Sequence, residues 1–182
     1  MKPKHIWRAA ISFQVSALTV PRVEATRTKL STPWRPVATA SDAYRTLLLM
    51  GLASLVDATA RPRWTADELC LLAKERPGAG GKHVVLGLDM LAARRIEVLR
   101  KKLSTKSRPI TTAGTLRTLV LVGLDHTEKR PMKHRGETLE RFLKAVNARI
   151  EALAAEQGRT PMTIFAMTVS SRLAVAEVRK RG

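Results

Sequence analysis

Polar side chains that can hydrogen-bond to a ligand alternate with apolar ones near the start of the chain. Ser12 and Gln14 stand between Ile11, Phe13 and Val15, and this period of two predicts a strand with one buried and one solvated face. A glutamine amide can pair bidentately with N6 and N7 of adenine, and a serine hydroxyl can donate to or accept from a base edge. A solvated strand face without a ligand would suit the same residues.

The residue types that perform catalysis or bind metals are few and scattered. The four histidines share no metal-ligand spacing, and the acidic residues are dispersed among basic ones. Cys70 is the only cysteine, which excludes an intramolecular disulfide and a zinc site built on thiolates. We therefore expect no enzymatic activity, no cofactor and no metal, and the cysteine usage fits a cytoplasmic protein.

The chain is strongly basic. Its 182 residues include 33 lysines and arginines against 15 acids, giving a formal net charge of +18 and a pI near 11.3. A charge of this size favours a polyanionic partner, and the sequence holds no apolar run long enough to suggest a membrane partner. Only 4% of the residues are aromatic, so the stacking platforms of single-strand binders are scarce. The composition favours double-stranded DNA.

The sequence contains two copies of one unit. The helical segment that ends in Lys29-Leu30-Ser31-Thr32 returns as one that ends in Lys102-Leu103-Ser104-Thr105, an offset of 73 residues. An Arg-Pro pair follows at 35–36 and at 108–109, and a Leu-rich segment then closes with Gly-Leu at 51–52 and at 123–124. The same offset lays the alternating strand 11–16 over residues 84–89. Because such a unit cannot bury its own apolar face, it is expected to pair with its copy.

These features resemble the ribbon-helix-helix family of DNA-binding proteins over residues 9–56 and 82–127. The resemblance rests on the alternating strand, the Arg-Pro turn and the Leu-rich second helix. It implies a mainly α fold with a two-stranded antiparallel ribbon, in which two units of one chain form a tandem ribbon-helix-helix pseudo-dimer. Two linked units in one chain are most similar to DNA-binding accessory proteins of T-DNA transfer.

The remaining segments are placed around these two units. Residues 1–8 form a basic arm, and residues 57–81 form a linker with a short helix that begins at a capping box, Thr65–Glu68. The run 43–56 is apolar nearly all round and is expected near the centre of the fold. Residues 134–180 form a C-terminal helical hairpin, which is expected to serve packing or self-association.

The outer face of the ribbon and the starts of the two second helices are the candidate binding sites. An antiparallel ribbon fits the major groove, so its outward side chains would read bases: Ser12, Gln14, His83 and Val85. Helix N-termini offer free N–H groups to anions, so nearby residues would hold phosphates: Arg35, Thr39, Ser41, Lys82, Arg108, Thr111 and Thr112. The hydroxyl groups among them would equally suit plain helix caps.

Three function classes remain open. The first is a sequence-specific double-stranded DNA-binding protein that acts as an accessory factor in plasmid or T-DNA-type DNA transfer and processing, beside other proteins of that complex. The second is a ribbon-helix-helix transcriptional repressor. The third and least favoured is a basic scaffold for protein interactions. The resemblance to a single-chain pseudo-dimer favours the first class.

Overall fold

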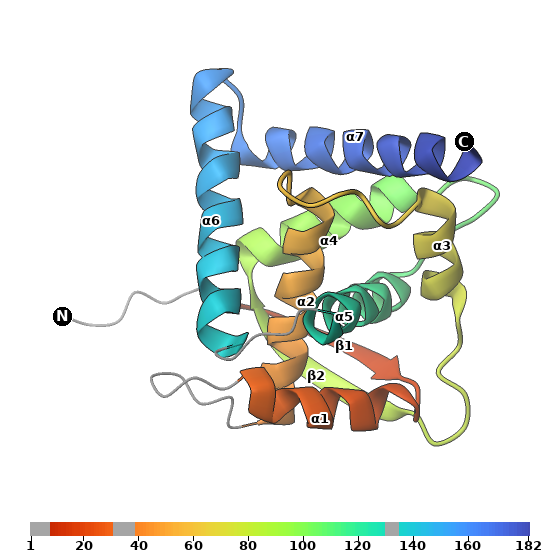
Figure 1. Cartoon of the computed structure of the whole chain (residues 1–182). Coiled ribbons are helices and arrows are strands. Elements are labelled where there is room, and N and C mark those ends of the chain that lie inside the picture. Colours follow the sequence, from red (N-terminus) through yellow and green to blue (C-terminus); the bar gives the residue numbers. More distant parts are fainter. Residues whose placement is uncertain (1–7, 31–38, 130–134) are drawn as a thin grey trace.

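The computed structural model describes residues 8–30, 39–129 and 135–182, and Figure 1 shows the elements within these ranges. In chain order they are β1 (Arg8–Val15), α1 (Thr19–Leu30), α2 (Ala40–Val56), α3 (Ala66–Lys74), β2 (Lys82–Asp89), α4 (Met90–Leu103), α5 (Thr112–Glu128), α6 (Arg135–Glu156) and α7 (Pro161–Arg181). The expected mainly helical fold with one two-stranded antiparallel sheet is confirmed. Of the expected basic arm 1–8, residues 1–7 lie outside the described residues, and Arg8 begins β1.

β1 and β2 pair antiparallel in a register that follows the internal repeat. Ser12 lies opposite Val85, which is its own equivalent at the offset of 73 residues. Phe13 lies opposite Val84, and their equivalents Leu86 and Ile11 also lie opposite each other. The two copies therefore pair through a two-fold relation centred on Ser12 and Val85.

The first helices of the two copies bury equivalent positions. In α1 the buried residues are Thr19, Val23, Thr26 and Leu30. In α4 they are Ala92, Ile96, Leu99 and Leu103, each 73 residues further along the chain. The repeat extends to the surface. An ion pair joins Glu24 to Arg27 in α1, and a second one joins the equivalent residues Glu97 and Arg100 in α4.

α2 and α5 form the centre of the fold and pack on each other more extensively than any other pair of described elements. Their backbones meet at two glycines. A Cβ on Gly51 would overlap the carbonyl oxygen of Leu119, and a Cβ on Gly123 would overlap that of Leu47. Gly51 of the first copy meets Leu119 of the second, and the equivalent Gly123 of the second copy meets the equivalent Leu47 of the first. Such reciprocal contacts between equivalent residues are the pattern of an isologous two-fold interface. The expected burial of residues 43–56 at the centre is confirmed for most of the run.

Different elements cover the two central helices. α3 begins at the expected capping box and packs on α5, whereas α6 and α7 pack on α2, with α7 also against α4 (Figure 1). Arg95 of α4 donates to Oδ1 of Asn147 in α6 at 2.6 Å and lies 5.3 Å from the ring centroid of Phe165 in α7. Phe165 and Val169 belong to the same hydrophobic core as the ribbon. The hairpin therefore has the expected packing role and completes this core.

We expect Gly123→Ala to destabilise the protein, even though alanine is the better helix former by about 1 kcal/mol. The new methyl group would overlap the carbonyl oxygen of Leu47, a backbone atom that no rotamer change can remove. α2 and α5 must then separate, and the expected loss in the free energy of unfolding is about 1–3 kcal/mol. Urea denaturation measures this loss.

Gly182→Ala is the matched control for that substitution. A Cβ there would meet nothing closer than the carbonyl oxygen of Val178 at 3.9 Å, so the free energy of unfolding should stay unchanged within error. A Gly123→Ala variant as stable as this control would contradict the close approach of α2 and α5.

Candidate nucleic-acid interface

One face of the ribbon is buried and the other is open to solvent. Phe13 and Val15 of β1 and Val84, Leu86 and Leu88 of β2 point into the core, each with at most 4% of its surface exposed. The four expected base-reading residues alternate with these and are all exposed: Ser12, Gln14, His83 and Val85. The period of two thus places every one of them on the outer face, because neighbouring side chains in a strand point to opposite sides.

The strand register joins these four residues into two neighbouring pairs. Ser12 lies opposite Val85 at the centre of the ribbon, and Gln14 lies opposite His83 toward one end. The other end carries Ala10 opposite Gly87, which offer no side-chain hydrogen bonds. The amide of Gln14 donates to the carbonyl oxygen of Gly81 at 3.3 Å, an exposed bond that costs little to exchange. Hydrogen-bonding side chains therefore lie on one side of the Ser12–Val85 pair, whereas Ala10 and Gly87 on the other side offer none before the ribbon ends at Arg8 opposite Asp89.

The start of α2 already holds a carboxylate of the chain itself. Thr39 is the N-cap and accepts from the backbone N–H of Asp42, while its hydroxyl donates to the Asp42 carboxylate at 2.7 Å. That hydroxyl and the guanidinium of Arg45 hold the pKa of Asp42 below its ordinary value. Ser41 is half-buried in the same turn. Asp42 is not among the residues expected at this site, although the Thr-x-x-Asp spacing at 39–42 is a local signal for it. The negative charge of Asp42 disfavours a phosphate there.

The start of α5 carries no such charge. Thr111 is the N-cap and accepts from the N–H of Gly114 at 3.0 Å, Thr112 is exposed, and the first turn contains no acidic residue. Arg100 of α4 donates to the carbonyl oxygen of Ile110 at 3.2 Å but is also ion-paired with Glu97, so it brings no uncompensated cation to this helix start. Of the two expected phosphate positions, the start of α5 is electrostatically the better one.

The expected basic phosphate ligands are placed separately. Arg35 lies outside the described residues. Arg108 forms an exposed ion pair with Asp67 at 2.9 Å, a kind of pair that contributes little to stability and can be exchanged. Lys82 is exposed at the end of the ribbon, opposite Val15. Three further exposed cations, which the sequence did not predict as phosphate ligands, lie at the end of α4 and in the turn that follows it: Lys101, Lys102 and Lys106.

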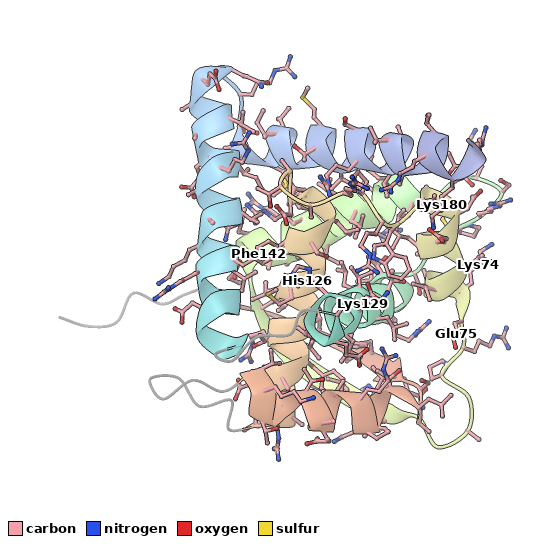
Figure 2. All side chains as sticks on the ribbon, in the orientation of Figure 1. Lys74, Glu75, His126, Lys129, Phe142 and Lys180 are labelled. Atoms are coloured by element: carbon pink, nitrogen blue, oxygen red, sulfur yellow. The ribbon has the colours of Figure 1, made fainter. Side chains whose placement is uncertain are left out.

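The described ranges offer no competing metal or membrane site. Across residues 8–30, 39–129 and 135–182, no group of three or more His, Cys, Asp or Glu side chains could hold a metal ion. None of the helices in these ranges has the length and apolar character needed to cross a membrane. His126 of α5 stacks on Phe142 of α6 with ring centroids 4.9 Å apart (Figure 2), a contact between two helices.

Comparison with known proteins adds no relative: no protein-family model, no curated protein and no solved structure matches the chain. The internal repeat and the geometry of the ribbon are therefore the observations from which a function can be argued.

Proposed function

We propose that the chain is a sequence-specific double-stranded DNA-binding protein that inserts the outer face of the β1–β2 ribbon into the major groove. The single observation that carries this proposal is the row of exposed side chains on that face. The major groove presents a distinct hydrogen-bonding pattern at each base pair, and Ser12, Gln14 and His83 supply donors and acceptors. Val85 supplies an apolar contact for a thymine methyl group.

We further propose that the architecture is a tandem ribbon-helix-helix pseudo-dimer within one chain. Three observations support this: the ribbon pairs the two copies about Ser12 and Val85, α1 and α4 bury equivalent positions, and α2 and α5 meet through reciprocal glycine contacts. Because the two copies are covalently linked, their DNA-reading residues are free to differ. They do differ at every outward position of the ribbon.

Phosphate anchoring in this proposal is unequal between the two halves. The first turn of α5 contains no acidic residue, and the N-terminus of a helix attracts an anion. At the start of α2 the carboxylate of Asp42 already accepts from the hydroxyl of Thr39. The excess charge of +18 supplies the sequence-independent attraction to the backbone.

The cellular role that we propose is an accessory factor in plasmid or T-DNA-type DNA transfer and processing. It rests on the resemblance of two linked units to accessory proteins of such systems. A transcriptional repressor would use the same DNA-binding surface, so the genes beside this one distinguish the two. Relaxase and secretion genes would favour transfer, and an adjacent self-regulated operon would favour repression.

Duplex DNA should bind in preference to single strands of the same sequence, and its affinity should fall steeply as salt rises. Each phosphate contact is expected to add about −0.9 to the slope of log K against log salt. Fluorescence anisotropy at several salt concentrations measures both quantities. Equal affinity for a polyglutamate chain and for duplex DNA would favour the scaffold class instead.

Gln14→Ala should weaken specific binding by about 1–3 kcal/mol, the usual discrimination of one bidentate base contact, and leave non-specific binding nearly unchanged. Val85→Ala should cost less and act only where the site holds a thymine. The matched control is Gln157→Ala, because Gln157 is an exposed glutamine in the turn between α6 and α7. A Gln14→Ala variant that keeps its sequence preference would show that the ribbon face does not read bases.

The preferred DNA site should be asymmetric, because the Gln14–His83 end of the ribbon can hydrogen-bond to bases and the Ala10–Gly87 end cannot. Selection from random duplexes tests this directly. One half-site should be well defined and the other loosely defined. Recovery of a perfect palindrome would contradict the unequal reading of the two halves.

A further inference from the structure

A cavity of about 240 Å³ opens where the end of β1 and the start of α1 meet the end of α3 and the middle of α5. Its walls are mainly apolar and include Val15, Leu72 and Leu121. Arg117 of α5 also lines it. A concave, mainly apolar space with a few charged groups at its wall is the usual form of a small-ligand site.

The guanidinium of Arg117 is poorly satisfied within the chain. Its Nε is buried and has no hydrogen-bond acceptor. Its Nη2 donates to the carbonyl oxygen of Ala73 across a long 3.3 Å. Burial lowers the pKa of Arg117, and the nearby charge of Glu75 opposes this without an ion pair between the two residues. A partly buried cation in this state lacks the partner that normally offsets its desolvation.

The internal repeat supplies a matched comparison for this arginine. The equivalent residue in the other half is Arg45, at the offset of 72 that relates α2 to α5. Arg45 donates from Nε to the carbonyl oxygen of Gly87 at 2.9 Å and from Nη1 to the carboxylate of Asp42 at 2.5 Å. A second acid, Asp89, caps α4 by accepting from the N–H of Ala92 at 2.7 Å.

Neither acid has an acidic equivalent in the other half. The position equivalent to Asp42 is Gly114, and the position equivalent to Asp89 is Ser16, whose hydroxyl accepts from the N–H of Thr19 at 3.3 Å. The arginine is thus repeated without the carboxylate that pairs with Arg45 in the first copy. Ser16 and Arg117 both line the cavity, whereas a Cβ at Gly114 would meet the backbone of Ala73 in α3.

The other charged residues around the cavity form no ion pair with Arg117. Arg22 is held by Glu128 through two hydrogen bonds of 3.1 and 2.7 Å. Glu75 follows the end of α3 (Figure 2) and is exposed, as is its neighbour Arg76. With Arg22 paired to Glu128, the charged residues left in the cavity wall are Arg76, Arg117 and Glu75, so the cavity carries a net positive charge.

We propose that this cavity binds a small organic carboxylate. The carboxylate of the ligand accepts from Arg117, whose Nε has no acceptor in the chain, and its apolar body fills the space against Val15, Leu72 and Leu121. The volume is sufficient, because a protein cavity of roughly 150 Å³ already holds benzene. This site is separate from the outer face of the ribbon and does not depend on DNA binding.

The test uses the full chain with benzoate as the probe and benzamide as its neutral match. Benzoate should bind with a one-to-one stoichiometry in isothermal titration calorimetry and raise the melting temperature as its concentration rises. Benzamide should do neither. Equal effects of the two compounds, or no effect of benzoate, would overturn the proposal.

Substitutions at Ser16 test the position without removing the arginine. Ser16→Asp restores the acid that Asp89 supplies in the other copy and remains a good helix cap, so it should abolish benzoate binding. Ser16→Asn is the matched neutral cap and should bind benzoate as the unchanged chain does. Benzoate binding that survives Ser16→Asp would overturn the proposal.

Arg117→Gln gives an independent check on the same site. The variant should bind benzoate about tenfold more weakly or worse, because hydrogen bonds to charged groups are among the stronger ones. Unchanged affinity in a variant with native circular dichroism would contradict the assigned role of Arg117. If that variant fails to fold, the two Ser16 variants still decide between the outcomes.

Discussion

The contact between α2 and α5 is the constraint on which the rest of the structure depends. Two helices can approach this closely only where neither carries a side chain, and Gly51 and Gly123 meet that need at equivalent positions. The approach fixes how the two copies face each other. It thereby sets how α1 and α4 close the core and how β1 meets β2 in register. A ribbon of two strands would be only marginally stable without this helical layer beneath it.

The departures from the repeat are as informative as the repeat itself. At the ribbon, Gln14 and His83 have Gly87 and Ala10 as their equivalents, so hydrogen-bonding groups gather at one end. Below it, Asp42 is replaced in the second copy, which leaves the start of α5 free of acids and Arg117 without a carboxylate. A homodimer would have to carry the same residue in both halves. Covalent linkage of the copies removes that constraint.

The charged side chains and the apolar core play different parts in this protein. Most ion pairs of the described residues are exposed, such as Arg108 with Asp67, and pairs of this kind contribute little to stability. The fold is instead held by the apolar core, which the C-terminal hairpin completes through Phe165 and its neighbours. The large positive charge is therefore available to a polyanion without loss of the contacts that hold the chain together.

The sequence by itself determined the elements, their repeat and the side of each strand that faces water. Alternation in 11–15 and the capping box at Thr65 are local signals, and each predicted an element that the structure contains. The Gly-Leu pairs were expected to end the second helices, and this was wrong, because α2 and α5 each continue four residues beyond them. Only the tertiary structure decided which distant residues meet. The pairing of Gln14 with His83 and the cavity at Arg117 join segments whose relative placement depends on packing throughout the core. No local pattern encodes that placement, because it follows from the close approach of α2 and α5 and from the elements that cover each of them.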